Sequence, residues 1–316
     1  MALINTWWED LSNRLCESTI RNSTGINAMK VVLFCGGLGS RLGEYSETIP
    51  KPMVEIGYRP LMWHLMRYYA HYGHKDFILC LGYKGDYIKK YFLNYDECLS
   101  NDFVMEKGGK EIRLYNNDIE DWTISFVDTG MHANIGQRLL AVKEHLDGED
   151  AFLANYADGL SDLDLNVYLK HFFQQNKVGS FLCVRPSQSF HLVNFSEDGC
   201  VESLSPVWKS DIWINGGFFV FKKEIFNYIE EGEELVQEPF YRLIEDCQII
   251  GYKNPGFWAC IDTMKEKKMF DDMYARGETP WTVWESANRA AKANILNQEK
   301  NHAKTTTVES TPKLYR

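Results

Sequence analysis

Hydrophobic runs and amphipathic segments alternate along the first half of the chain. The run at residues 31–34 is entirely apolar, which predicts a short strand buried on both faces of a sheet. Residues 60–72 carry apolar side chains at helical spacing. The pattern then predicts strands at 77–81, 122–127 and 151–155 and helices at 85–95 and 136–146. Because strands that alternate with helices form parallel sheets covered on both faces, the pattern predicts an α/β fold.

The pattern changes after the helix that begins near Leu165. Several short strands follow one another there, which predicts a β-rich lobe. The predicted elements are strands at 180–185, 191–195, 201–204, 216–221 and 248–252 and helices at 224–228, 239–247 and 264–273. We therefore expect a mostly parallel central sheet with a β-rich lobe attached to it.

The two ends of the chain differ in pattern from the middle. Residues 1–28 combine apolar positions at helical spacing with a polar linker, and we expect an N-terminal extension there. Such a helix either packs on its own domain or another subunit, or acts as a partner-binding arm. Residues 286–316 are polar, which predicts a mobile tail. One domain over residues 29–285 is the expected organisation.

Composition narrows the classes of function. A hydrophobic content of 45% is ample for a packed core. The formal net charge of −10 argues against nucleic-acid binding, which needs a basic surface stripe. No apolar run approaches transmembrane length and the N-terminus lacks a signal-peptide pattern, so we expect a cytoplasmic protein without membrane contact. The eight cysteines form no CxxC pair, which fits reduced thiols better than zinc ligation or disulfides.

The stretch after the first strand is the first candidate site. Gly36 and Gly37 directly follow that strand, and without a Cβ their backbone N–H groups can approach a phosphate closely. Arg41 and Lys51 add two positive charges in an acidic protein. Together these residues predict a nucleotide-phosphate site, with a simple tight turn as the alternative. Neither the Walker motif nor the GxGxxG dinucleotide motif is present.

A second candidate site lies after the strand predicted at 151–155. Asp158 occupies the turn that follows it. The carboxyl ends of parallel strands meet at one edge of a sheet, so Asp158 is expected near the glycines. A carboxylate there is placed to hold a hard divalent cation beside a triphosphate, or it caps a turn. Asp162 and Asp164 have the pattern of caps for the helix that follows.

The glycine stretch resembles the GGxGTRL…KPM signature of the sugar-1-phosphate nucleotidyltransferases, with Ser40 in place of the usual threonine. The similarity extends over residues 29–285 and is strongest to the glucose-1-phosphate cytidylyltransferases within that family. The stretches that carry it include PKPMVEIG (50–57), LGYKGDYIKKYF (81–92), VDTG (127–130), YADG (156–159), INGGFFVF (214–221), QEP (237–239) and PGFW (255–258).

This resemblance implies a Rossmann-like nucleotidyltransferase fold, a homo-oligomer, and a β-rich lobe that binds the acceptor. It also implies transfer of CMP from CTP to a phosphorylated acceptor, glucose 1-phosphate or a related sugar phosphate, with release of pyrophosphate. Such reactions serve nucleotide-sugar and polysaccharide biosynthesis. The chemistry requires two anions to meet, so cations and positioning matter more than an activated nucleophile.

The resemblance also implies roles for individual residues. Asp158 and Asp262 match the aspartates that hold Mg²⁺, and with Arg41 and Lys51 they would carry catalysis. The nucleotide would be bound by Gly36, Gly37, Gly39, Ser40, Arg41, Lys51 and Thr129. The acceptor would be bound by Asn215, Gly216 and Glu238.

Two departures from the family pattern fall on the acceptor side. Family members carry an EKP motif before INGG, whose lysine meets the acceptor phosphate, and no EKP is present here. Lys209 is the candidate replacement for that lysine. His191 stands where the family tends to have a glycine that lets the sugar approach the backbone.

These departures leave several interpretations open. They are neutral drift in a surface loop, or they indicate an acceptor other than glucose 1-phosphate, such as a different phosphate or a phosphonate. An inactive nucleotide-binding regulatory module is a third interpretation. It fits less well, because a mere binder would not need both metal-holding aspartates together with Arg41 and Lys51.

Overall fold

The computed structural model describes residues 26–37, 49–186 and 190–285. Gly39, Ser40 and Arg41 of the expected nucleotide site lie outside this part, as do most of the expected N-terminal extension and the expected C-terminal tail. The chain divides into two compact units, Met1–Trp281 and Thr282–Arg316. The elements below belong to the first unit, except for a final 3₁₀ turn.

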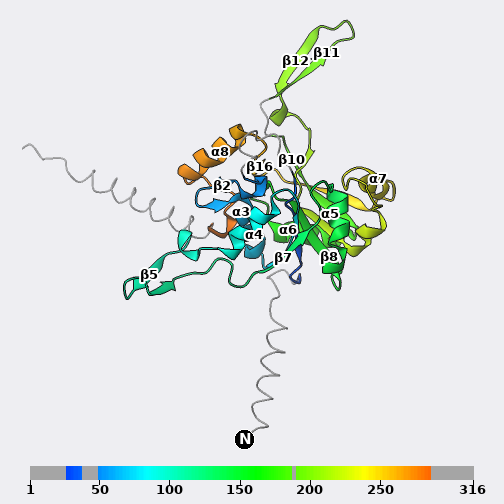
Figure 1. The fold of residues 1–316 in the computed structure, drawn as a ribbon. Helices are drawn as coiled ribbons and strands as arrows, with labels where there is room; N and C mark the ends of the chain where they lie inside the picture. The colour runs from blue at the N-terminus through cyan, green and yellow to red at the C-terminus, as the bar shows by residue number, and fades with distance from the viewer. Residues whose placement is uncertain (1–25, 38–48, 187–189, 286–316) are drawn as a thin grey trace, which may run out of the picture. The chain divides into compact units, whose positions relative to one another are not determined.

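An eight-stranded sheet forms the centre of the first unit, in the order β13-β10-β14-β8-β1-β4-β7 with β15 paired to β10 (Figure 1). Strands β8, β1, β4 and β7 are mutually parallel, whereas β14 is antiparallel to both β8 and β10. The strands of this sheet are β1 (Val31–Phe34), β4 (Asp76–Leu81), β7 (Thr123–Asp128), β8 (Ala151–Tyr156), β10 (Gly179–Val184), β13 (Ile214–Asn215), β14 (Phe219–Lys222) and β15 (Ile249–Lys253). The predicted mostly parallel α/β sheet is therefore confirmed.

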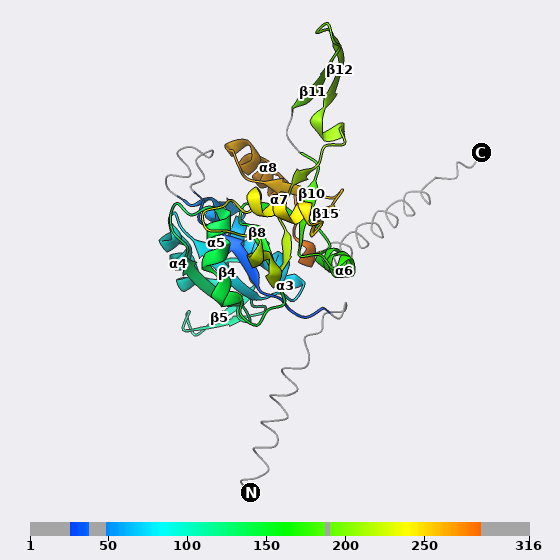
Figure 2. The same cartoon turned by 90° about the vertical axis from the view of Figure 1, so that its right-hand side faces the viewer.

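Four small two-stranded sheets surround the central one. They pair β2 (Glu55–Ile56) with β3 (Arg59–Pro60), β5 (Phe103–Glu106) with β6 (Glu111–Leu114), β9 (Gly159–Ser161) with β16 (Trp258–Cys260), and β11 (His191–Phe195) with β12 (Val201–Pro206). The β11–β12 hairpin projects away from the central sheet in both views (Figures 1 and 2). The β-rich part thus consists of this hairpin together with strands that extend the central sheet.

Helices cover both faces of the sheet. The α-helices are α3 (Leu61–His71), α4 (Gly85–Leu93), α5 (Ile135–Ala141), α6 (Leu165–Gln175), α7 (Glu238–Glu245) and α8 (Met264–Ala275). The 3₁₀ turns are η2 (Lys51–Met53), η3 (Glu97–Leu99), η4 (Lys143–Leu146), η5 (Val207–Lys209), η6 (Lys223–Asn227) and η7 (Val283–Glu285). The helix expected at 136–146 is thus an α-helix only to Ala141, followed by η4.

The two faces of the sheet pack different residues. Leu139 of α5 and Phe240 of α7 share one hydrophobic cluster with Val32, Phe152 and Phe221 of the sheet. On the other face, aromatic side chains of α3 and α6 meet the sheet: Tyr69 accepts a hydrogen bond from Asn155, and Tyr168 contacts Tyr252. Alternate residues of each strand therefore belong to alternate faces, as the pleat requires. The face covered by α5 and α7 is called the α7 face below.

Asp164 is the N-cap of α6, since its Oδ1 accepts a hydrogen bond from the Val167 N–H. The expectation that Asp162 is a second cap is wrong. The N–H of Asp162 donates to the Phe257 carbonyl, which extends the pairing of β9 with β16. Asp162 is therefore held beside that small sheet, before the helix begins.

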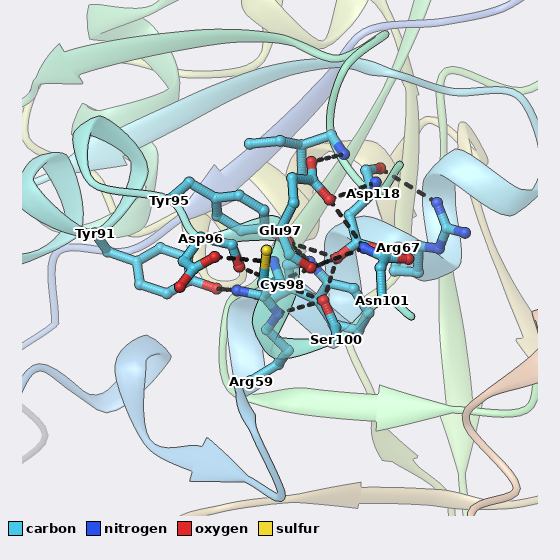
Figure 3. Close-up of polar contacts among 12 residues, drawn as sticks. Arg59, Arg67, Tyr91, Tyr95, Asp96, Glu97, Cys98, Ser100, Asn101 and Asp118 are labelled. Carbon is cyan, nitrogen blue, oxygen red and sulfur yellow. Dashed lines mark hydrogen bonds and ion pairs between the residues drawn. The ribbon is translucent and has the colours of Figure 1, made fainter. Parts of the chain in front are cut away.

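The segment between α4 and β7 is attached through a buried polar cluster (Figure 3). Arg59 donates hydrogen bonds to Ser100 and to the Asp96 carbonyl, pairs with Asp118 at 3.3 Å, and lies 4.2 Å from the Tyr95 ring centroid. Arg59 and Asp118 are only 2% and 5% exposed, so removing either partner would leave the other as a buried, unpaired charge.

Within the described part of the chain, no helix is long and apolar enough to cross a membrane.

Candidate active site

Three charged residues from distant parts of the chain meet at the carboxyl edge of the sheet. The Lys51 Nζ lies 2.6 Å from Asp158 Oδ2 and 2.5 Å from Asp262 Oδ1. Lys51 is mostly buried, with 14% of its side chain exposed, while the two carboxylates are about one-third exposed at 32% and 30%. The lysine therefore bridges the two aspartates, whose side chains stay partly open to solvent.

Strand pairing explains why the two aspartates meet. Asp158 lies between β8 and β9, and Asp262 follows β16 by two residues. Strands β9 and β16 pair in antiparallel register, with Gly159 opposite Cys260, and the Ile261 N–H donates to the Asp158 carbonyl at 2.9 Å. The ladder thus sets the two acids side by side, although they are 104 residues apart.

The electrostatics of the triad keep the lysine charged. Burial on its own would lower the pKa of Lys51, but the nearby Asp158 and Asp262 carboxylates outweigh burial and raise the pKa above its usual value. At neutral pH the ammonium is therefore fully protonated and compensates one of the two negative charges.

The donor set suits a hard divalent cation. Mg²⁺ is commonly bound by one or two carboxylates together with phosphate oxygens and water. Asp158 and Asp262 already converge on one cationic group, the Lys51 ammonium. Among the described residues, no group of three or more His, Cys, Asp or Glu side chains could hold a metal ion. The pair therefore fits a metal that brings further ligands from its substrate.

The glycine turn is built around a buried arginine that the sequence analysis did not single out. Arg138 of α5 is 2% exposed, and its guanidinium donates to the carbonyls of Gly36 (3.0 Å) and Leu81 (3.1 Å) and to Thr129 Oγ1 (2.7 Å). A Cβ on Gly36 would lie 2.1 Å from Arg138 Nη1, so only glycine fits there. The same arginine therefore ties the turn after β1 to the turn after β7.

A cavity of about 280 Å³ joins these features. Its lining includes the turn after β1, the start of α5 and the charged triad. The lining residues that concern the chemistry are Gly37, Lys51, Arg138, Tyr156, Asp158, Glu234 and Asp262. The structure thus brings together Gly36, Gly37, Lys51, Thr129, Asp158 and Asp262 of the residues singled out from sequence.

The expected acceptor residues lie beyond this cavity, around β13. The side chain of Asn215 interacts with that of Tyr156, which lines the cavity. Gly216 is buried, and its carbonyl accepts a hydrogen bond from Trp258 Nε1 at 2.9 Å. Glu238 is the exposed first residue of α7. Asn215 is therefore the member of this group with a contact to the cavity lining.

The two departures from the family pattern lie on or beside the β11–β12 hairpin. His191 begins β11 opposite Pro206 and is exposed. Lys209 ends η5, and its ammonium lies 5.0 Å from the ring centroid of Trp208. Neither contacts the Lys51 triad through an interaction recorded for the described residues.

Arg138, Tyr156 and Glu234 are site residues that sequence reasoning missed. Arg138 offered one signal, a charged residue within the apolar part of an amphipathic helix. Tyr156 directly precedes the turn that holds Asp158. Glu234 lies in a polar connection with no regular pattern, so the sequence contains no signal for it.

Comparison with known proteins identifies the family of this chain. The family model described as nucleotidyl transferase matches residues 30–258. The glucose-1-phosphate cytidylyltransferase of Salmonella typhi is 36% identical over 259 residues, which are 81% of this chain and 100% of that protein. A probable glucose-1-phosphate cytidylyltransferase of Bacillus subtilis is 35% identical over 258 residues, with the same shares covered. The resemblance stated from the sequence motifs is therefore confirmed.

Solved structures confirm the fold. A UDP-glucose pyrophosphorylase complexed with UDP-glucose has a TM-score of 0.58 at 16% identity and covers 79% of this chain and 100% of that one. HddC from Yersinia pseudotuberculosis has a TM-score of 0.54 at 17% identity, covering 78% and 99%. With the family match over residues 30–258, these findings show that the chain belongs to the nucleotidyl transferase family.

Proposed function

We propose that this protein transfers CMP from CTP to a phosphorylated sugar, glucose 1-phosphate or a related compound, and releases pyrophosphate. The observation that carries the proposal is the meeting of Lys51, Asp158 and Asp262 at the cavity beside the glycine turn. Identity of 36% to a glucose-1-phosphate cytidylyltransferase over 81% of the chain supports the choice of nucleotide and acceptor.

The residues of the site address the main obstacle to this reaction, which is charge repulsion. A phosphate oxygen of the acceptor attacks the α-phosphorus of CTP, and the bond to the pyrophosphate leaving group breaks. The acceptor phosphate is already ionised at neutral pH, so no general base is needed. Lys51, kept protonated by its two carboxylate neighbours, turns to the phosphates and offsets the charge that develops there.

Asp158 and Asp262 are the proposed holders of the metal, and Mg²⁺ is the proposed ion. When bound, the ion neutralises phosphate charge and aligns the two substrates. Movement of Lys51 from the aspartates to the phosphates would make the carboxylate oxygens that it contacts available to the ion. A divalent metal is in keeping with the family, and its identity as Mg²⁺ belongs to this proposal.

The proposal divides the remaining residues between two halves of the site. Gly36, Gly37 and Thr129 bind the nucleotide, with Gly39, Ser40 and Arg41 completing that half from the undescribed stretch. Arg138 positions the turn through the Gly36 carbonyl. The acceptor half is assigned to Asn215, Gly216, Glu238, Lys209 and His191. We further propose a cytoplasmic homo-oligomer, with the domain bounded at residues 29 and 285.

A second candidate is a cytidylyltransferase for a phosphate or phosphonate acceptor other than glucose 1-phosphate. The missing EKP motif and His191 favour it, because both lie on the acceptor side. The inactive binding module is not favoured, since the Lys51 triad is complete.

The test is pyrophosphate release from CTP and Mg²⁺ with a panel of phosphorylated acceptors, and with UTP in a parallel series. At least one acceptor should support turnover with CTP. Lys51→Met should reduce turnover at least a hundredfold, because it removes the charge at the reacting phosphates. Lys90→Met is the matched control, since Lys90 forms an exposed ion pair with Asp86 on α4. CTP binding without turnover on any acceptor would instead identify a binding module.

A further inference from the structure

A cluster of two cations and one indole lies next to the expected acceptor residues. Arg185 Cζ and Lys253 Nζ each lie 4.9 Å from the ring centroid of Trp213. Contacts of this length are cation–π interactions, which hold a cation without neutralising it. Arg185, Trp213 and Lys253 are called the indole cluster below.

Strand register places the indole cluster on the α7 face. Cys183 of β10 is paired with Asn215 of β13 on one side and with Lys253 of β15 on the other, so these three form one row. Side chains in one row point to the same face of the sheet, and so do the side chains two residues away along each strand. Arg185 follows Cys183 by two residues and Trp213 precedes Asn215 by two residues. Because β10 and β13 are antiparallel, both belong to the next row on the same face. Strands β10 and β15 lie side by side in Figure 2.

The α7 face is also the face on which the cavity opens. Phe181, two residues before Cys183, packs in the cluster that contains Phe240 of α7, and Tyr156 packs against the same cluster. Tyr156 lines the cavity, and its side chain interacts with that of Asn215. A continuous line of residues therefore leads from the Lys51 triad through Tyr156 and Asn215 to the indole cluster.

The charge of the indole cluster is not balanced within it. Asp211 lies 3.5 Å from Arg185 and accepts a hydrogen bond from Trp213 Nε1 at 3.1 Å, and Arg185 also donates to the Ser210 carbonyl. Asp211 is 86% exposed and Arg185 is 41% exposed, so this ion pair is weak and exchangeable. Lys253 has no ion-pair partner among the described residues. One positive charge is left over.

The distance between Asn215 and Lys253 is short enough for one small molecule to contact both. Two strand spacings separate Lys253 from Asn215, which is about 10 Å between Cα atoms. The long side chains of Arg185 and Lys253 can extend toward Asn215, so the distance that the ligand must cover is shorter than the distance between the Cα atoms. A phosphorylated sugar held at Asn215, with its reacting phosphate at the Lys51 triad, would therefore point its far end at the indole cluster.

We propose that Arg185 and Lys253, held by Trp213, bind a second anionic group of the acceptor, either a carboxylate or a second phosphate. This rests on the proposed function and narrows its acceptor class to sugar phosphates with two acidic groups. A guanidinium that lies over an indole can still donate its N–H groups to a carboxylate or phosphate. The bound anion takes the place of Asp211 beside Arg185 and supplies the missing partner of Lys253.

The test compares three acceptors that differ only at the far end of the sugar: glucose 1-phosphate, glucuronic acid 1-phosphate and glucose 1,6-bisphosphate. With CTP and Mg²⁺, kcat/KM should be at least tenfold higher for one of the doubly anionic acceptors than for glucose 1-phosphate. Arg185→Gln and Lys253→Gln should each reduce this ratio about tenfold, which corresponds to about 1.4 kcal/mol. The reduction should appear as a higher KM for the doubly anionic acceptor. Lys223→Gln, an exposed lysine on η6, is the control.

Two kinetic results would overturn the inference. One is equal use of all three acceptors by the unaltered protein, and the other is a ratio that both variants leave unchanged. A calorimetric measurement tests the inference separately from the proposed function. It measures the binding of glucose 1,6-bisphosphate in the presence of a non-hydrolysable CTP analogue. Binding that Arg185→Gln weakens, without pyrophosphate release from any acceptor, would support the inference and reject the activity. Binding that the variant does not weaken would reject the inference.

Discussion

Gly36 is a position where a single added methyl group should strongly destabilise the fold. An alanine Cβ there would lie 2.1 Å from Arg138 Nη1 and 2.3 Å from its Cζ. The end of an arginine is normally free to move away, but this one is 2% exposed and held by three hydrogen bonds of 2.7–3.1 Å. Gly36→Ala therefore forces the guanidinium out of its site.

The magnitude follows from those three hydrogen bonds. Each intramolecular hydrogen bond contributes about 1 kcal/mol net, and somewhat more with a charged donor. Displacing Arg138 should thus lower the free energy of unfolding by about 3 to 5 kcal/mol. The neighbouring Gly37 is the matched control, because it is exposed and a Cβ there would meet nothing within 4 Å. Gly37→Ala should cost less than about 1 kcal/mol.

Urea denaturation without nucleotide measures both variants independently of activity. The double variant Gly36→Ala/Arg138→Met adds a second check. If the clash with Arg138 is the cause, the two changes should be strongly non-additive, since removing the guanidinium removes the clash. Equal stability of the two alanine variants, or simple additivity in the double variant, would refute the reasoning.

Further expectations concern the triad, a buried histidine and the Arg59 cluster. Asp158→Asn should reduce pyrophosphate release at least a hundredfold while the circular dichroism spectrum stays unchanged; an active variant would contradict the proposed metal role. Burial lowers the pKa of His64 to about 4, below its value of about 6.5 in the unfolded chain, so its stabilising effect is complete above about pH 6.5 and is lost as the pH falls toward 4. From pH 7 to pH 5 this amounts to about 2 kcal/mol, and urea titrations should show a shallower pH dependence in His64→Gln. Arg59→Met should cost about 3 to 5 kcal/mol because it leaves Asp118 buried without its partner. The exposed pair removed by Lys90→Met should cost less than about 0.5 kcal/mol, and similar losses for the two variants would contradict the role of burial.

The parallel half of the sheet could be predicted because its information is local. The runs at 31–34, 77–81 and 151–155 are continuous and apolar, and each strand begins and ends within one residue of the prediction. Local pattern is sufficient where burial on both faces leaves few alternatives.

The antiparallel half was harder, because its pairing is not local. The predicted strand at 216–221 is interrupted: Gly217 and Phe218 have φ angles of 75° and 49°, so β13 ends at Asn215 and β14 begins at Phe219. Nothing in the residue pattern indicates that β14 lies between β8 and β10. The motifs indicated Lys51, Asp158 and Asp262 singly, but their convergence depends on the β9–β16 ladder. Arg138 was missed because one arginine in a helix has many ordinary explanations.

The position of Lys51 between the two aspartates has a thermodynamic consequence. A free divalent ion that binds there must first displace an ammonium held at 2.6 and 2.5 Å, so the internal cation competes with it. In the proposed reaction a nucleoside triphosphate would remove that competition, because its phosphates would attract Lys51 and add oxygen ligands of their own. Metal and nucleotide should therefore bind with positive cooperativity, with a coupling free energy of about 1–3 kcal/mol. By reciprocity, each ligand raises the affinity for the other by the same factor, and the site responds to the pair more than to either one.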